Sequence, residues 1–260
     1  MSLSTAPLIS AHELLVAWTV RTIRARYQQS ILGWFWAIVQ PAASVAIYSV
    51  VFTMVVPVET GGFPYAVFSY IAVVPWTLLS TSLTDMTGSL VGNISLVQKI
   101  YFPRQVLPVS AMTARLMDFG VAASLLVVLM VAYRTPVFPA AMVYLPLVLA
   151  VQLMLIAGLG LACAALNVFY RDVQSLLVLV LQLWFYASPV IYPVSLVPEN
   201  YRWLYYLNPM AGIIQGYRDI LLTGAAPGLY LVNAGVISVL LLVAGQWIFH
   251  RYEPLFADII

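Results

Sequence analysis

The feature that most constrains this sequence is a series of long apolar stretches with almost no charged residues. The hydrocarbon core of a bilayer is about 30 Å thick, so a helix that rises 1.5 Å per residue needs roughly 20 apolar residues to cross it. These stretches lack the alternation of barrel strands, and helices are the other structure whose backbone is satisfied in lipid. We therefore expect an all-α polytopic membrane protein with six transmembrane helices, at residues 33–56, 65–83, 107–132, 140–169, 175–191 and 229–249.

The composition excludes several other classes of protein. Apolar residues make up 63% of the 260 residues and charged residues 8%, whereas about a quarter of a soluble domain is charged. The formal charge of +2 is too small for a protein that binds nucleic acid electrostatically. Cys163 is the single cysteine, and His12 and His250 lie at opposite ends of the chain, so neither a disulfide nor a metal site is expected.

The distribution of basic residues predicts the orientation in the membrane. Six crossings put both termini on one side, and short cytoplasmic loops carry an excess of Lys and Arg. A cytoplasmic N-terminus places seven basic residues inside, namely Arg21, Arg24, Arg26, Lys99, Arg104, Arg171 and Arg251. Three then lie outside, namely Arg134, Arg202 and Arg218. We therefore expect both termini in the cytoplasm.

Residues 10–30 are too polar to cross a membrane and predict an interface helix. Ser10 and Glu13 form a capping-box pattern, which marks the start of a helix. Apolar and small residues then recur at helical spacing, namely Ala11, Leu14, Leu15, Trp18 and Thr22. An amphipathic helix of this kind lies in the cytoplasmic interface with its arginines near anionic headgroups. The alternative is a helical leader that is merely solvated.

Two further segments do not span. In residues 85–104 an apolar stripe of Leu90, Ile94, Val97 and Tyr101 predicts a short exposed helix on which a soluble partner docks, with a plain connecting loop as the alternative. In residues 193–224 prolines interrupt apolar pieces that are too short to cross. We expect half-inserted helices there, near the external face, which line or cap a pathway.

The sequence lacks the chemistry of an enzyme or an ATPase. It contains no phosphate-binding loop, and Lys99, the only lysine, follows Gln98 and not a glycine. Arg115 and Asp118 interrupt the third stretch and lie three residues apart, so they can neutralise each other on one helix face. We read them as a structural ion pair, with a direct role in transport as the alternative. No catalytic residue is expected.

Aromatic residues, at 13% of the chain, are abundant enough to include a functional subset. On the first and fifth predicted helices and just beyond, candidates for contact with a sugar in a pore are Trp34, Trp36, Tyr48, Phe52, Trp184, Tyr186 and Tyr192. Aromatic rings offer apolar faces with polar tips, which suits sugars because their C–H faces are apolar and their rims are hydroxylated. The alternative is that these rings face lipid or pack helices together.

Several short segments, in order along the chain, carry a resemblance to a known family. They are residues 24–37 (RARYQQSILGWFWA) with Gln40-Pro41, residues 99–104 (KIYFPR), 170–173 (YRDV), 188–193 (SPVIYP) and 207–210 (LNPM). Together they resemble the membrane subunit of type-2 ATP-binding-cassette exporters for polysaccharides. That group includes the permeases for lipopolysaccharide O-antigen, capsule and teichoic acid, and these motifs do not distinguish the polymer.

The resemblance implies a homodimer of this subunit in the bacterial inner membrane, with two copies of a separate nucleotide-binding ATPase subunit. ATP and Mg²⁺ would bind to that partner, no cofactor would bind to this chain, and the substrate would be a lipid-linked glycan, most closely O-antigen. The residues that it implies for coupling to the ATPase are Glu13, Arg21, Ser95, Leu96, Val97, Gln98, Lys99 and Tyr101. The first and fifth helices would line the channel, and Pro193, Asn208 and Pro209 would belong to the external gate.

Two other readings stay open at this point. An exporter of the same architecture could carry a small molecule or a lipid, and an intramembrane enzyme would catalyse a reaction without any ATPase partner.

Overall fold

The computed structural model describes residues 6–28, 33–55, 57–99 and 102–256, all in helices, turns or irregular segments and with no strand among them. Within these ranges five helical segments are long and apolar enough to cross a membrane: Trp36–Val55, Tyr65–Ser89, Val106–Ala132, Ala141–Phe169 and Leu229–Leu255. The expectation of an all-α chain with several membrane-spanning helices is thus confirmed.

The chain runs through ten α-helices joined by short 3₁₀ and π turns in the described ranges. The α-helices are α1 Ala6–Tyr27, α2 Trp36–Val50, α3 Tyr65–Ser89, α4 Ile94–Lys99, α5 Val106–Ala132, α6 Leu145–Phe169, α7 Asp172–Tyr186, α8 Glu199–Tyr205, α9 Pro209–Arg218 and α10 Leu229–Tyr252. The short turns are η1 Gly33–Phe35, η2 Val51–Val55, η3 Val91–Asn93, η4 Ala141–Tyr144, η5 Val194–Leu196, η6 Asp219–Thr223 and η7 Glu253–Leu255.

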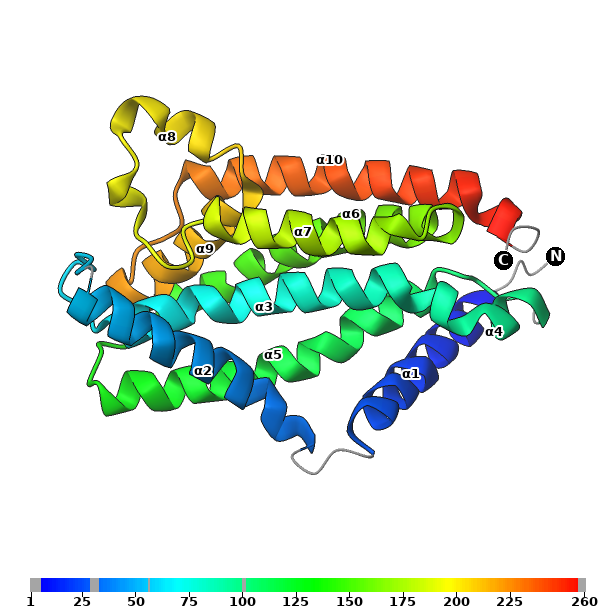
Figure 1. The fold of residues 1–260 in the computed structure, drawn as a ribbon, viewed down its shortest axis with the longest axis horizontal. Coiled ribbons are helices and arrows are strands. Elements are labelled where there is room, and N and C mark those ends of the chain that lie inside the picture. The colour runs from blue at the N-terminus through cyan, green and yellow to red at the C-terminus, as the bar shows by residue number, and fades with distance from the viewer. Residues whose placement is uncertain (1–5, 29–32, 56, 100–101, 257–260) are drawn as a thin grey trace.

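The long helices form an elongated bundle around α3 (Figure 1). In the most apolar 18 residues of α3, 78% are buried. The helix contacts α2, α5, α6, α7 and α9. One end of the bundle, which we call the α4 end, carries α4, the start of α1 and the end of α10 (Figure 1). The opposite end, the α8 end, carries the α8 hairpin. The described parts of both terminal helices therefore reach the same end of the bundle.

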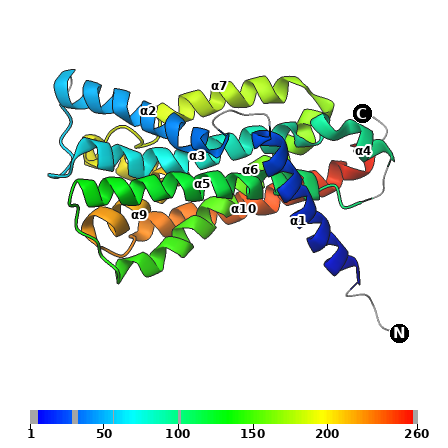
Figure 2. The same cartoon turned by 90° about the horizontal axis from the view of Figure 1, so that it is seen from below.

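α1 crosses the bundle obliquely and rests on α5 (Figure 2). Leu15, Trp18 and Thr22 are half-buried on one side of this helix, whereas Val16 and Val20 are exposed. The helix begins at Ala6, before the predicted capping box, so the prediction that Ser10 caps it is wrong. A cap requires a non-helical residue at the start of the helix, and residue 10 already lies in its second turn.

α3 is longer than the sequence pattern predicts. The apolar stretch ends near residue 83, but the helix continues to Ser89, so that Asp85 lies within α3 and not in a loop. η3 and α4 follow directly, and Asn93 Nδ2 donates to the carbonyl of Ser89 at 2.8 Å across the junction. The segment 85–104 is therefore largely helical, and α4 is joined closely to α3.

The fifth predicted span is shorter than expected. α7 contains 15 residues, which corresponds to about 22 Å at 1.5 Å per residue. Its helical hydrogen bonding ends at Ala187, where the chain turns. Beyond it, α8 is largely exposed, whereas α9 is buried along most of its length. The predicted pieces of 193–224 are therefore present as helices.

α6 and α10 pack closely through glycines. A Cβ added at Gly245 would lie 2.0 Å from the backbone oxygen of Gly158, and one added at Gly158 would lie 2.5 Å from the backbone carbon of Leu241. Small residues at such crossings let two backbones approach within van der Waals contact inside a membrane. The glycines are thus required for the closeness of this helix pair.

We predict that Gly245→Ala destabilises the protein by about 2 kcal/mol or more, because the new methyl group must separate two backbones. The measurement is the apparent melting temperature of the purified chain. Gly120→Ala in α5 is the control, since a Cβ there meets nothing within 4 Å. Equal melting temperatures for the two variants would contradict the close packing of α6 on α10.

Candidate functional site

An aromatic pocket of about 370 Å³ lies between α2, α3 and α7, which run along one side of the bundle (Figure 2). Trp76 of α3 meets Trp184 at 6.0 Å and Phe185 at 5.5 Å between ring centroids, both edge to face. Tyr48 of α2 lies 6.1 Å from Phe185. Edge-to-face contacts of this kind hold rings in defined orientations.

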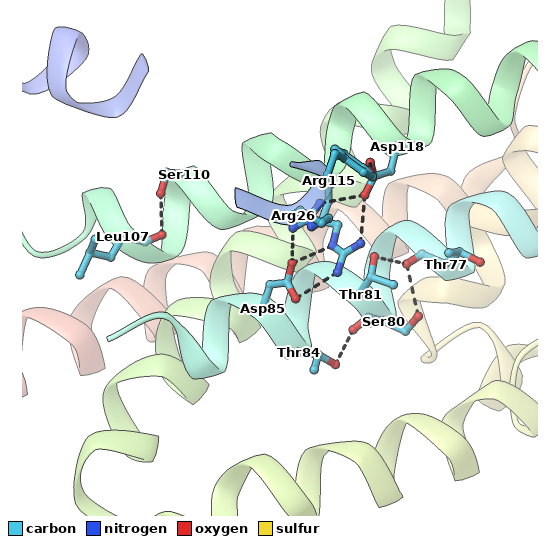
Figure 3. Close-up of polar contacts among 11 residues, drawn as sticks. Arg26, Thr77, Ser80, Thr81, Thr84, Asp85, Leu107, Ser110, Arg115 and Asp118 are labelled. Atoms are coloured by element: carbon cyan, nitrogen blue, oxygen red, sulfur yellow. Dashed lines mark hydrogen bonds and ion pairs between the residues drawn. The ribbon is translucent and has the colours of Figure 1, made fainter. Parts of the chain in front are cut away.

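Hydroxyl groups of α3 extend along the helix from this pocket toward the α4 end. Thr77, Ser80, Thr81 and Thr84 follow the i, i+3, i+4, i+7 spacing of one helix face. Ser80 and Thr81 donate to the carbonyl of Thr77 at 3.3 and 2.7 Å, and Thr84 donates to that of Ser80 at 2.8 Å (Figure 3). Because the protons of Ser80, Thr81 and Thr84 are used within the helix, their oxygen lone pairs are left to accept from a ligand.

The wall of the pocket thus combines ring faces with hydrogen-bonding groups. Thr77 and Ser80 line it beside the aromatic side chains, and Ser44 of α2 and Gln182 of α7 complete its polar part. A pocket with this composition suits a ligand whose faces are apolar and whose edges carry hydroxyls.

The structure brings together some of the predicted channel residues and separates others. Tyr48 and Tyr186 line the aromatic pocket, and Trp184 packs behind it against Trp76. Phe52 instead stacks on Tyr65 at 5.5 Å. Two predicted residues take no described part: Trp36 lines a separate cavity of about 140 Å³ near Arg26, and the side chain of Trp34 lies outside the described residues.

Trp76 and the hydroxyls of α3 were missed by the sequence-based reasoning. The second predicted span was identified only as a long stretch without charged residues, and none of its residues was proposed for the site. The signal that was present is the run of four hydroxyl residues at helical spacing in an otherwise apolar stretch. Period alone, however, does not say which helices face this side of α3.

Asn208, a predicted gate residue, ties α9 to α7. Its Oδ1 accepts from the backbone N–H of Met210 at 3.0 Å, which caps α9, and from Trp184 Nε1 at 2.8 Å. Its Nδ2 donates to the carbonyl of Ala187 at 3.1 Å and to Ser188 Oγ at 2.9 Å. Pro209 occupies the first turn of α9, where the missing N–H costs nothing.

Arg218 is buried at the end of α9, although the sequence places it among external basic residues. Its guanidinium lies 3.7 Å from the ring centroid of Phe68 and donates to the carbonyls of Val190 at 3.1 Å and Tyr192 at 3.3 Å. Tyr192 OH in turn donates to the carbonyl of Tyr186 at 2.9 Å. Arg218 therefore holds the turn that leads from the aromatic pocket to the extended residue Pro193.

A second connection between α9 and the pocket runs through Gln152 of α6. Gln152 Nε2 donates to the carbonyl of Pro75 at 2.8 Å, and its Oε1 accepts from Tyr217 OH of α9 at 3.0 Å. Gln152 and Tyr217 are buried, and a buried amide needs such partners because unpaired polar groups are costly in an apolar interior. Pro75 directly precedes Trp76, so α9 is linked to the wall of the pocket.

Four charged side chains form an ion cluster at the junction of α1, α3 and α5 (Figure 3). Arg26 of α1 bonds Asp85 at 2.6 Å and Asp118 at 2.9 Å, and Arg115 of α5 bonds Asp85 at 2.7 Å and Asp118 at 2.9 Å. The predicted pairing of Arg115 with Asp118 is thus confirmed, but within a larger cluster. Each carboxylate bridges two guanidinium groups.

The ion cluster is electrically neutral, which explains how it is tolerated within the bundle. Asp118 lies 12 residues from the start of α5, or roughly 18 Å along the helix. Isolated charges at such depth are expensive, whereas forked Arg–carboxylate pairs compensate the charge and fix geometry. Tyr27 OH also donates to Asp118; burial first, and this hydrogen bond next, raise the pKa of Tyr27, so its hydroxyl stays protonated.

The predicted coupling residues lie at the surface where the structure describes them. Glu13 and Arg21 are exposed on α1, and the guanidinium of Arg21 lies 4.2 Å from the ring centroid of Trp18. On α4, Ser95 and Gln98 are exposed and Leu96 is half-buried. The side chains of Val97 and Lys99, and the whole of Tyr101, lie outside the described residues.

Among the described residues no group of three or more His, Cys, Asp or Glu side chains is placed to hold a metal ion.

We predict that Arg26→Ala lowers the apparent melting temperature of the purified chain by about 5 °C, because hydrogen bonds to charged groups contribute about 1.5–3 kcal/mol. Arg26→Lys should fall between wild type and Arg26→Ala, since an ammonium group lacks the fork that reaches both carboxylates. The control is Arg24→Ala, whose parent side chain is exposed on the same helix. The same melting temperature for Arg26→Ala and Arg24→Ala would contradict a stabilising cluster.

The sequence matches a family profile and several known proteins. The profile of the ABC-2 type transporter family matches residues 13–222. The chain is 34% identical over 249 residues to the O-antigen export system permease protein RfbA of Myxococcus xanthus, covering 94% of each chain, and 28% identical over 248 residues to a protein of that name from Klebsiella pneumoniae, covering 95% of each. It is 24% identical over 240 residues to the polysialic acid transport protein KpsM of Escherichia coli, covering 90% of this chain and 91% of KpsM.

The matched region runs from α1 through η6 and contains the aromatic pocket, the ion cluster and the α9 contacts. It makes up well over half of the chain, and the relatives align over nearly their full lengths. This chain therefore belongs to the ABC-2 type transporter family.

Proposed function

We propose that the chain is the permease subunit of an exporter that moves a lipid-linked polysaccharide, most closely an O-antigen, across the bacterial inner membrane. The observation that carries this proposal is the aromatic pocket, in which ring faces alternate with hydrogen-bonding groups within a membrane-spanning bundle. The names of the relatives, two O-antigen export permeases and a polysialic acid transport protein, support a glycan as the cargo.

The aromatic pocket fits a sugar better than it fits an acyl chain. A hydrocarbon gains nothing from the acceptor oxygens of Thr77 and Ser80, whereas a sugar hydroxyl can donate to them. The rings of Tyr48 and Tyr186 offer flat apolar surfaces to the C–H faces of a sugar. A polymer can pass such a wall stepwise because neither kind of contact is specific for one residue of the glycan.

The energy for export would come from a separate ATPase subunit. The sequence has no phosphate-binding loop, so ATP and Mg²⁺ are assigned to that partner, with two copies serving a homodimer of this chain. α4 is the proposed coupling helix: it lies at one end of the bundle (Figure 1), presents Ser95 and Gln98 to solvent, and continues from α3 through η3. α1, with Glu13 and Arg21, would form a second contact.

Both proposed contacts lead to the helix that carries Trp76. A push on α4 reaches α3 along the backbone, and a push on α1 reaches α3 and α5 through the ion cluster. Rigid elements with two arrangements can convert such a displacement into opening of a path between subunits. The ion cluster would thus transmit force, which gives it a role beyond neutralising Arg115.

The proposed topology has six crossings in a single transmembrane domain, residues 1–260, with both termini in the cytoplasm. α7 would be the fifth crossing, completed by the turn after Ala187, and α9 would be a re-entrant helix at the external face. Asn208, Pro209 and Pro193 would form the hinge of the gate, since α9 is tied there to α7. Interface helix 10–30, coupling segment 85–104 and gate segment 193–224 complete the arrangement.

The test of this function is reconstitution with the ATPase. We expect this chain to co-purify with its ATPase partner, and lipid-linked O-antigen to stimulate ATP hydrolysis by the complex in nanodiscs. Stimulation by lipid alone, with no effect of the glycan, would favour a lipid exporter and contradict the proposal. Transport by the purified chain without an ATPase would also contradict it.

We predict that Tyr186→Ala slows glycan export about fivefold, which corresponds to about 1 kcal/mol for one lost aromatic contact. Tyr133→Ala is the matched control, because Tyr133 is also exposed but lies outside the pocket. The readout is the rate at which polysaccharide reaches the cell surface, normalised to the amount of permease in the membrane. Equal slowing by the two substitutions would remove the case for the pocket as a glycan path.

We predict that Val97→Pro uncouples ATP hydrolysis from export while leaving the subunit in the membrane, because proline in the short helix α4 removes a backbone hydrogen bond and costs about 3 kcal/mol. Val97→Ala keeps the helix and should export nearly normally. Normal export by the proline variant would count against α4 as the coupling helix. Charge reversal at Lys99 should weaken coupling in the same way.

A further inference from the structure

A second pocket, of about 470 Å³, lies at the α8 end and shares no residue with the aromatic pocket. We call it the α8 pocket. Its volume is within the roughly 300–1,000 Å³ of small-molecule sites. Five segments contribute polar side chains to it: Glu59 and Thr60 before α3, Ser195 of η5, Arg202 of α8, Gln215 of α9 and Asp219 of η6. Figure 1 shows α8 standing off the bundle at this end.

Hydrogen-bond donors, hydrogen-bond acceptors and aromatic rings lie close together in the α8 pocket. Gln215 Nε2 donates to Asp219 Oδ1 at 2.8 Å, which fixes both side chains and leaves Gln215 Oε1 to accept. Tyr206 lines the pocket and stacks on Tyr230 with ring centroids 5.2 Å apart. Phe63 adds a second ring. The pocket thus repeats the combination of rings and hydrogen-bonding groups found in the aromatic pocket.

The charges that line the α8 pocket favour a polyhydroxyl ligand over a simple ion. Glu59 and Asp219 oppose Arg202 and Arg218, so the formal charge of the lining is zero. A phosphate or a carboxylate would meet two carboxylates, and a metal ion would meet two guanidinium groups. Hydroxyls can instead donate to the carboxylates and accept from the guanidinium and amide groups.

The α8 pocket is joined to the aromatic pocket through Arg218. This side chain lines the α8 pocket, and it donates to the carbonyl of Tyr192, whose hydroxyl reaches the carbonyl of Tyr186. Pro193, the next residue, also lines the α8 pocket. Arg218 and Tyr192 therefore connect the wall of the α8 pocket to that of the aromatic pocket.

We propose that the α8 pocket binds a saccharide unit of the exported chain as it leaves the aromatic pocket. This inference rests on the proposed function, because it assigns a second subsite to the same cargo. Gln215, Asp219 and Glu59 bind the sugar hydroxyls, Tyr206 and Phe63 contact its apolar face, and Arg218 holds the wall between the two pockets. Occupancy of this site opposes backward sliding of the chain.

The test uses thiol protection in the complete complex with its ATPase, in nanodiscs. In a Cys163→Ala background, Ser195→Cys places a thiol in the α8 pocket, and Tyr201→Cys places one on the exposed side of α8 outside it. The probe is the O-polysaccharide isolated from the producing cells. At twice its Kd it should slow maleimide labelling of Ser195→Cys about threefold and leave labelling of Tyr201→Cys unchanged.

Two variants separate binding from folding. Asp219→Asn and Gln215→Ala should each abolish the protection of Ser195→Cys while the complex keeps its melting temperature. Absence of protection, or equal protection of both thiols, in a complex that exports polysaccharide would overturn the α8 subsite and leave the proposed function standing. Failure of the proposed function has a separate readout: cells that lack this chain would still carry a normal amount of polysaccharide on their surface.

Discussion

The structure depends on one constraint, namely that the interior of a bilayer offers no hydrogen bonds to an unpaired polar group. α3 lies at the centre of the bundle and is joined to its neighbours by polar contacts. Gln152 donates to the carbonyl of Pro75, and Asp85 pairs with two arginines from two other helices. Because these partners come from α1, α5 and α6, satisfying α3 also determines which helices surround it.

The spans were predictable because length and apolarity are local properties of the sequence. The apolar stretches correspond to helices. Their predicted ends are wrong where a helix continues beyond its apolar residues, as α3 does after residue 83. The ion cluster was predictable only in its local part, the three-residue spacing of Arg115 and Asp118. Arg26 lies 92 positions from Asp118 and 59 from Asp85, and no single-sequence pattern reports such pairing.

In the candidate site too, some residues were predictable from the sequence around them, whereas others depend on contacts between distant segments. Ring residues on α2 and α7 were proposed from composition, and Tyr48 and Tyr186 do line the aromatic pocket. Trp76 was missed, because its role follows from the packing of α3 against both helices and not from its neighbours in sequence. Asn208 was singled out within a short motif, but its bond to Trp184 needed the fold to bring residues 24 positions apart together.

The amide of Gln152 has a consequence for exchanging parts between related permeases. It lies in α6, far in sequence from α9, yet it accepts from Tyr217 and donates to the carbonyl beside Trp76. A chimera that receives residues 193–224 from a relative without a tyrosine hydroxyl at this position would leave the amide oxygen of Gln152 without a hydrogen-bond partner in the buried interior of the bundle. A functional exchange of residues 193–224 therefore has to include position 152 from the same relative.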